Sequence, residues 1–153
     1  MCHAFKQARP PERRKMKNFE LTSDMLTMGG VFYPKGYVFI MFPDANDAAK
    51  VAREVDADRD NGGETMLLSP ASVLRDIGKV DGESDVDLPS VGTEGATVNK
   101  YIQLARKGHH AMMVKVKSDE HAASVVAAAK KVPFSYGQRY HLLAMEDIEQ
   151  ETA

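Results

Sequence analysis

The feature that most constrains the fold of this chain is an apolar run at residues 35–42, Lys-Gly-Tyr-Val-Phe-Ile-Met-Phe. The run is rich in β-branched and aromatic residues, as β-strands are, and it is too short to cross a membrane. Side chains on a strand alternate between two faces. One face carries Val38, Ile40 and Phe42. The other face carries Tyr37, Phe39 and Met41. Both faces are apolar, so both need to be covered.

A strand–helix–strand unit is predicted to begin with this run. Asp44 suits the N-cap of a helix over 45–55, where alanine and valine recur at helical spacing. After a polar turn, the sequence Thr-Met-Leu-Leu at residues 65–68 predicts a second strand. The helix of this unit is expected to pack on the sheet that the strands form.

Two helices are predicted between this unit and the next. Ser69 suits an N-cap with Pro70 at the first helical position, and Gly78 stands where a C′ glycine would end a short helix. The acidic segment 79–94 is typical of a solvated loop. Apolar spacing then predicts a helix over 96–107, closed by a glycine.

The second unit repeats the layout of the first. A strand is predicted over 109–117, then a helix capped by Ser118 and stopped by Pro133, then a last strand over 139–145. This internal repeat predicts an α+β, ferredoxin-like two-layer sandwich, with a four-stranded antiparallel sheet from two βαβ halves. The two inserted helices are expected either to cover the other sheet face or to pack at the sheet edge.

One domain of ordinary size is expected over residues 18–148, because 43% of the 153 residues are hydrophobic and can fill a core. Residues 1–17 are expected to be a disordered basic arm or an upstream extension, with translation starting at Met1 or at Met16. Residues 149–153 are expected to form a flexible acidic tail.

Charge and cysteine content narrow the classes of partner and compartment. The formal charge of −2 divides into +4 over residues 1–15 and therefore −6 over residues 16–153, which disfavours phosphate unless a local basic patch exists. Cys2 is the single cysteine, so the chain forms no internal disulfide. No segment approaches the ~20 apolar residues of a membrane span. We expect a soluble, cytoplasmic protein with no membrane partner.

Residues 35–42 resemble the longer signature strand of the RNA-recognition motif family, Lys/Arg, Gly, Phe/Tyr, Gly/Ala, Phe, Val, any residue, Phe/Tyr. Val38 replaces the small residue of that pattern, and Ile40 replaces its valine. The helix that follows also looks like that family. The resemblance covers only this strand and helix, and it implies binding of RNA or single-stranded DNA.

The resemblance also implies roles for individual residues. Tyr37 and Phe39 would stack on unpaired bases, and Lys35 would contact a phosphate. Lys115 and Lys117, on the predicted third strand, would extend the basic patch. We therefore expect a non-catalytic binding domain whose working surface is this aromatic sheet face, which also carries Met41 and Met113.

The aromatic face has a second interpretation, in which it is buried beneath the inserted helices or against a second copy of the sheet. An exposed apolar patch of this size is costly, and ferredoxin-like domains frequently pair face to face. This alternative predicts a homodimeric scaffold or a stress or regulatory protein with no nucleic-acid role. The duplicated layout is similar to small bacterial stress-associated domains of unassigned function.

Histidines suggest a third hypothesis. In the expected strand order 4-1-3-2, the starts of strands three and four lie at one end of the sheet, roughly 10 Å apart, which is too far for a shared zinc ion. His110, Arg139 and His141 would then form a polar cluster that serves as a pH-sensitive, small-molecule or enzyme site. No metal and no cofactor are expected.

Two loop motifs are rejected. Residues 56–62 begin like a calcium loop, but their glycine is one position late, and Leu67 stands where a bidentate Glu is needed. Residues 92–97 precede a helix without the Lys of a phosphate-binding loop. The sequence also contains none of the common hydrolase or metalloprotease motifs, so we expect no catalytic residues and no enzyme.

Overall fold

The structure is a computed structural model, and everything below concerns the residues that it describes. These are residues 17–26, 31–57, 64–78, 92–141 and 145–148. The predicted basic arm up to residue 16, the acidic loop up to residue 91 and the tail from residue 149 lie outside this part of the chain. The question of the start codon lies outside it as well.

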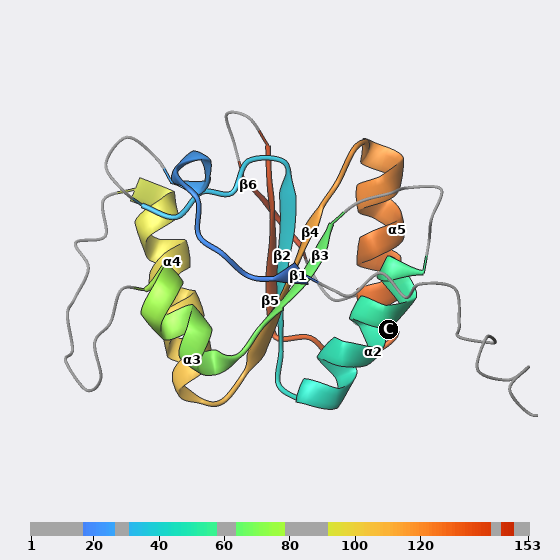
Figure 1. Ribbon diagram of the computed structural model, residues 1–153, viewed down its shortest axis with the longest axis horizontal. Coiled ribbons are helices and arrows are strands. Elements are labelled where there is room, and N and C mark those ends of the chain that lie inside the picture. The colour runs from blue at the N-terminus through green and yellow to red at the C-terminus, as the bar shows by residue number, and fades with distance from the viewer. Residues whose placement is uncertain (1–16, 27–30, 58–63, 79–91, 142–144, 149–153) are drawn as a thin grey trace, which may run out of the picture.

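The described strands form one sheet in the order β1-β3-β4-β2-β5-β6 (Figure 1). They are β1 (Lys17–Asn18), β2 (Tyr37–Phe42), β3 (Thr65–Leu68), β4 (His110–Lys115), β5 (Tyr136–Tyr140) and β6 (Met145–Asp147). All neighbours from β3 to β6 are antiparallel, and the two-residue β1 runs parallel to β3. The prediction of four strands is wrong, because the short edge strands β1 and β6 extend the sheet. Strand β2, the apolar run at the start of the first unit, lies in the centre and pairs with β4 and β5.

Three of the described helices begin at a polar residue that caps them. They are α2 (Ala45–Asp56), α3 (Pro70–Ser72), α4 (Gly92–Arg106) and α5 (Asp119–Ala129), with a 3-10 turn η1 (Ser23–Met25) and a π-helical turn η2 (Val73–Ile77). Asp44 caps α2 by accepting a hydrogen bond from the Asn46 amide at 2.7 Å. Ser118 caps α5 by accepting one from the His121 amide at 3.0 Å. Ser69 caps α3 by accepting one from the Ser72 amide at 3.1 Å, so all three predicted caps are confirmed.

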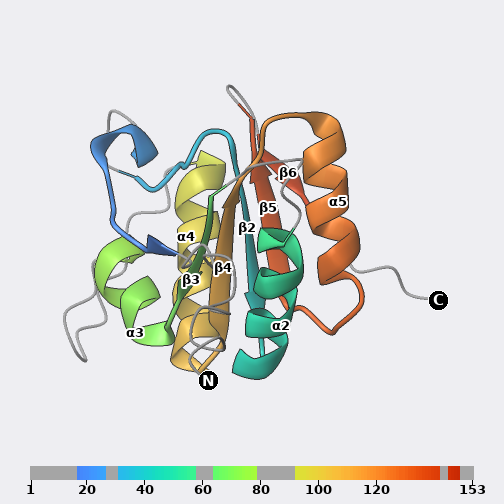
Figure 2. The ribbon, with the colours of Figure 1, turned by 45° about the vertical axis from the view of Figure 1, so that its right-hand side comes forward.

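Helices cover both faces of the sheet, so the molecule has three layers (Figures 1 and 2). Helices α2 and α5 lie on one face, and α3 and α4, the inserted pair, lie on the other. The helices of the two strand–helix–strand units share one face, as a two-layer sandwich requires, and the inserted helices add a third layer. The inserted pair takes the first of its two predicted places and covers the sheet face.

Each face of β2 has its own core. Val38, Ile40 and Phe42 pack with the inward residues of α2 and α5, among them Val51, Ala52, Ala122 and Val125. Tyr37, Phe39 and Met41 pack with α4, η2 and the segment before β2, among them Phe32, Ile77, Val98 and Tyr101. The alternation read from the sequence is confirmed, since all six side chains of β2 are buried.

The last strand starts earlier than predicted. The predicted strand covers residues 139–145, but β5 spans Tyr136–Tyr140 and is followed by β6 in an antiparallel pair. Pairing with the centre of the sheet starts at once after Pro133, since the Ser135 amide donates to the Met41 carbonyl at 2.8 Å. The apolar residues 142–144, on which the prediction depended, lie outside the described part.

Gly78 ends its helix for a different reason than predicted. A C′ glycine adopts a positive φ, but Gly78 has a φ of −81°. A Cβ atom at this position would lie 2.7 Å from Cγ1 of Ile102 on α4. The absence of a side chain at Gly78 thus lets α4 approach the end of η2.

Candidate functional site

The predicted working surface on the aromatic face is closed within the monomer. Phe39 and Met41 have no exposed area, and Tyr37 is 7% exposed. The ring of Tyr101, from α4, lies 4.2 Å from the ring of Phe39 between centroids. Stacking on bases requires an accessible ring face, so the placement of a base-stacking surface at these residues is wrong for this fold.

Residues before β2 complete this cover. The ring of Phe32 meets Phe39 edge-on at 5.7 Å, Tyr140 at 6.2 Å and Tyr101 at 6.5 Å between centroids. Tyr33 donates a hydrogen bond from its hydroxyl to the carbonyl of His141 at 2.8 Å. Because one chain covers the face by itself, the reason for expecting a second copy there no longer applies.

The buried face contains one satisfied polar pair. The hydroxyls of Tyr101 and Tyr140 lie 2.7 Å apart, so one donates to the other. Burial raises the pKa of Tyr101 well above its usual value, and the neighbouring Tyr140 raises it further. Tyr101 therefore stays protonated at neutral pH, and the hydroxyl pair serves as a structural contact between α4 and β5.

The three lysines of the predicted nucleic-acid patch are exposed at one end of the sheet. Lys115 lies opposite Tyr37 in the β2–β4 pair. The hydrogen bond from Thr22 lowers the pKa of Asp24, and the charges of Lys115 and Lys35 lower it further. A carboxylate therefore already lies near two of these lysines.

The predicted polar cluster does not form as a unit. His110 lies opposite Phe42, at the end of β2, whereas Arg139 lies opposite Val38, near its start. Four strand residues separate these positions, which is about 13 Å. The prediction failed because His141 follows the end of β5 instead of opening that strand.

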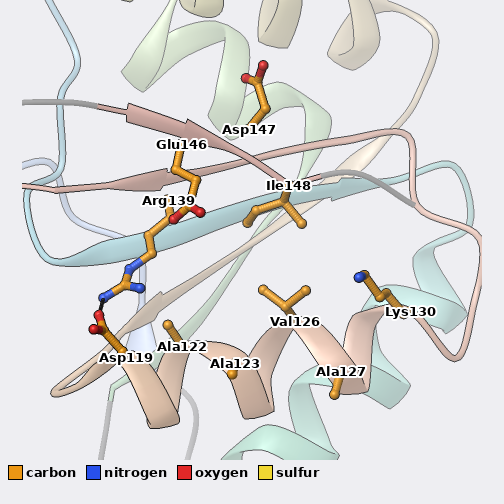
Figure 3. Close-up of a pocket in the computed structure, with 10 residues that line it drawn as sticks. All are labelled: Asp119, Ala122, Ala123, Val126, Ala127, Lys130, Arg139, Glu146, Asp147 and Ile148. Carbon is orange, nitrogen blue, oxygen red and sulfur yellow. Dashed lines mark hydrogen bonds and ion pairs between the residues drawn. The ribbon is translucent and has the colours of Figure 1, made fainter. Parts of the chain in front are cut away.

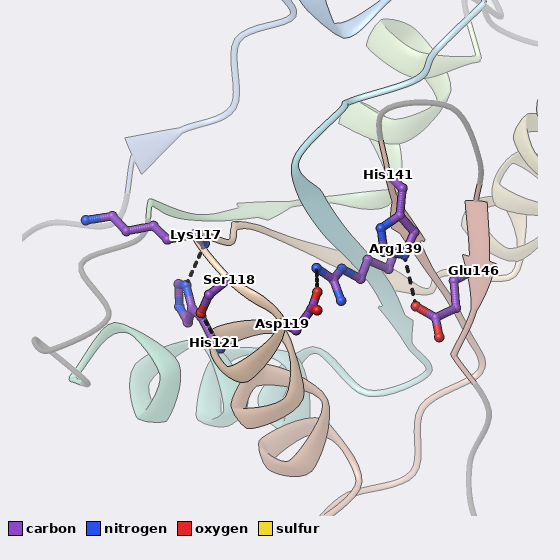
Figure 4. Close-up of polar contacts among 7 residues, drawn as sticks. All are labelled: Lys117, Ser118, Asp119, His121, Arg139, His141 and Glu146. Carbon is purple, nitrogen blue, oxygen red and sulfur yellow. Dashed lines mark hydrogen bonds and ion pairs between the residues drawn. The ribbon is translucent and has the colours of Figure 1, made fainter.

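A hollow of about 450 Å³ at the β2 start brings together Arg139, His141 and two of the lysines. It is lined by Lys35, Gly36, Val116, Lys117, Ser118, Asp119, Arg139, Tyr140 and His141. These residues come from the turn before β2, the β4–α5 connection and the end of β5. Asp119 is the single acidic residue in this lining. In Figure 4 the side chain of Lys117 points away from Arg139, so Lys117 forms the rim.

Arg139 is the central side chain of this site. Its side chain is 18% exposed, and its Nη2 donates to Oδ1 of Asp119 at 2.7 Å (Figure 4). The Asp119 side chain is 91% exposed. Within the described residues, no other partner contacts this guanidinium, although arginine has five N–H donors. The remaining donors are therefore available to water or to a ligand.

A second hollow, a groove of about 630 Å³, adjoins the first one (Figure 3). One wall is the outer face of α5, and the other is formed by β5, β6 and Ile148. Arg139 and Asp119 line both hollows. Figure 3 shows Arg139, Glu146 and Ile148 pointing toward α5, while Asp147 points away.

Acidic and basic side chains alternate along the shared border of the two hollows. Glu146 on β6 lies opposite Arg139 in the β5–β6 pair, and its Oε1 lies 3.1 Å from Nε2 of His141 (Figure 4). Sequence reasoning missed Asp119, a first-turn acid directly after the predicted cap, and Glu146, which fell beyond the last predicted strand. The one sequence signal for these two residues was the position of Asp119 directly after the predicted N-cap, Ser118.

Two kinds of feature are absent from the described part of the chain. No group of three or more His, Cys, Asp and Glu side chains in that part of the chain is placed to hold a metal ion. No helix there combines the length and the apolar character that crossing a bilayer requires.

Fold and hollows together define an α+β protein with a covered sheet and a basic site at one sheet end. No protein-family model, curated protein or solved structure matches the chain significantly. The chemistry of the hollow is therefore the basis for a functional hypothesis.

Proposed function

We propose that the protein is a non-catalytic binding domain for a small molecule with a phosphate or carboxylate group. The anion binds the guanidinium of Arg139 in place of Asp119. This proposal is based on Arg139. Its largely buried guanidinium forms one hydrogen bond, to an exposed carboxylate. A ligand with two anionic oxygens matches the planar guanidinium better than this single contact does.

The energetic cost of the exchange is small. An ion pair with a solvent-exposed partner contributes about 0–1 kcal/mol to stability, and salt weakens it further. A bidentate contact to a phosphate or carboxylate forms two charge-assisted hydrogen bonds, whereas Asp119 forms one. Asp119 returns to water when it is displaced, because its side chain is already 91% exposed.

Neighbouring basic groups add to the attraction. Lys35 and His141 line the hollow, and Lys117 at its rim contributes at longer range. The formal charge of −6 over residues 16–153 opposes a long polyanion. We therefore favour a compact anion over a nucleic-acid strand.

The architecture agrees with a binding site at the end of the sheet. The four longer strands lie in the order β3-β4-β2-β5. This is the strand order expected for a ferredoxin-like sheet. We assign the fold as a ferredoxin-like unit extended by β1 and β6 and covered by α3 and α4. In such a molecule the free binding surface lies at the sheet end and along the outer helices.

Calorimetric titration with methyl phosphate at low ionic strength tests the proposal. Arg139→Gln should lose at least tenfold in affinity, because the guanidinium is removed. Arg75→Gln is the matched control, since Arg75 forms an exposed ion pair with Asp76 away from the hollow. Equal affinity of these two variants would overturn the proposal.

A second pair of variants tests the exchange with Asp119. Asp119→Asn should tighten methyl phosphate binding severalfold, because it removes the competing carboxylate. Glu120→Gln removes the same charge from the same helical turn without a contact to Arg139, and should change affinity less. A thymidine oligonucleotide should bind no tighter per phosphate than methyl phosphate, whereas much tighter binding would favour a nucleic-acid function.

A further inference from the structure

We propose that the ligand of Arg139 is an amphiphile, with one anionic head group and an aliphatic chain that lies along α5. This inference rests on the proposed function, because the head group is the anion bound at Arg139. It adds the class of ligand and a second half of the binding site.

The connection between the two hollows determines where a ligand can extend. Arg139 and Asp119 line both of them, so an anion at Arg139 lies at the mouth of the groove. The first hollow is rimmed by Lys35, Lys117 and His141, which suit the head group and not an apolar chain. A ligand bound at Arg139 can extend along the groove, away from these basic side chains.

The middle of the groove is apolar. It is lined there by Ala122, Ala123, Val126, Ala127 and Ile148. The charged residues of the lining lie toward its two ends: Asp119, Arg139 and Glu146 at one end and Lys130, the C-cap of α5, at the other, while Asp147 points away from α5 (Figure 3). Methyl groups on two opposing walls are the surface that an aliphatic chain buries.

The length of the groove fits a medium-sized chain. Asp119 and Lys130 are eleven residues apart on a helix and its C-cap, which corresponds to roughly 16 Å. An eight-carbon chain is shorter than this distance. The exposed acids Asp119 and Glu146 at the borders, and Glu120 next to them on α5, disfavour docking of the whole face on an anionic membrane, so we infer a free single-chain molecule.

Comparison of methyl phosphate with octyl phosphate, both monomeric in solution, tests the inference by calorimetry on the full chain. A fully buried methylene strengthens binding about fourfold, and a half-buried one about twofold. The seven additional methylenes should therefore tighten binding by at least tenfold in this open groove.

A variant in the groove locates the chain. Ala127 is exposed on α5, so Ala127→Gln should fold normally and place a polar side chain across the groove. Octyl phosphate should then bind only as tightly as methyl phosphate, and methyl phosphate should be unaffected. Ala96→Gln, at an exposed position of α4, is the matched control and should change neither affinity.

The outcomes separate the two proposals. If both probes bind equally and both depend on Arg139, the inference is overturned and the anion site stands. If octyl phosphate binds more tightly but independently of Arg139, the inference is overturned as well. If neither probe binds, the proposed function fails and the inference fails with it.

Discussion

The ring of Tyr101 on α4 lies against the ring of Phe39 on β2, with centroids 4.2 Å apart and planes tilted by 36°. Both rings are completely buried. An inserted helix thus provides, within one chain, the cover that the apolar face of the central strand requires. The aromatic face belongs to the core, and ligand binding is left to surfaces elsewhere.

Phe39→Ala should destabilise the monomer. Truncation of a fully buried Phe costs about 3–5 kcal/mol, because it removes apolar contacts and leaves a cavity under Tyr101. Urea unfolding measures this change in the free energy of unfolding. Gln103→Ala, at an exposed position on α4, is the control and should stay within about 0.5 kcal/mol. A loss below about 1 kcal/mol for Phe39→Ala would contradict burial within the monomer.

The hydroxyl pair of Tyr101 and Tyr140 should show strong coupling. Tyr140→Phe leaves the Tyr101 hydroxyl buried without its partner, which costs about 1–3 kcal/mol. The double variant with Tyr101→Phe replaces both hydroxyls and should cost less than the sum of the single changes. A double-mutant cycle by urea unfolding measures this coupling, and simple additivity would show that the two hydroxyls do not interact.

Gly78→Ala and Gly36→Ala should destabilise the protein by different mechanisms. At Gly78 a Cβ would meet Ile102 at 2.7 Å, and such overpacking costs about 1–3 kcal/mol. At Gly36 no atom lies within 4 Å, but the φ of +85° strains an L residue by about 1–2 kcal/mol. Adding Ile102→Ala should reduce the effect of Gly78→Ala alone. Equal effects of Gly78→Ala with and without Ile102→Ala would argue against the steric explanation.

His109 should make stability depend on pH. Burial lowers the pKa of His109 below its ordinary value of 6.5, and the charge of Lys107 lowers it further. Ser135 uses its proton on the Met41 carbonyl at 3.0 Å, so it accepts from Nδ1–H of His109 at 2.9 Å. This contact does not require a charged imidazole.

The lowered pKa of His109 determines how the free energy of unfolding changes with pH. Between the folded pKa and 6.5 the unfolded chain binds more protons, so the free energy of unfolding rises with pH. Stability is lost as the pH falls through 6.5 and levels off below the folded pKa. Urea midpoints between about pH 5 and 8 should show a steeper slope for the natural chain than for His109→Gln. Identical slopes would contradict the lowered pKa.

Local patterns and caps predicted most of the secondary structure. Strand β2, helix α2 and strand β3 have the predicted positions, because alternation and the Asp44 cap are local signals. The cover of the aromatic face was left open, since alternation shows that a face needs a neighbour but not which chain supplies it. Strand β5 was misplaced because its Gly137, Gln138 and Arg139 lack the apolar character that identifies a strand from sequence.

The candidate site was only partly predictable. Lys35, Lys117, Arg139 and His141 were all singled out from the sequence, but they were assigned to two separate sites. Their convergence depends on the register of β5 against β2, which no local pattern specifies. The contact of Arg139 with Asp119 joins residues twenty positions apart through this same register.

The most direct test of the anion site is an amide NMR titration of the full chain with methyl phosphate. The largest shift changes should occur around the basic hollow, at Gly36, Ser118, Asp119 and Arg139. The amides of Phe39, Met41 and Tyr101 should remain nearly unchanged, because the aromatic face is sealed. Largest changes at Phe39, Met41 and Tyr101, with none at Arg139, would contradict both the sealed face and the proposed site.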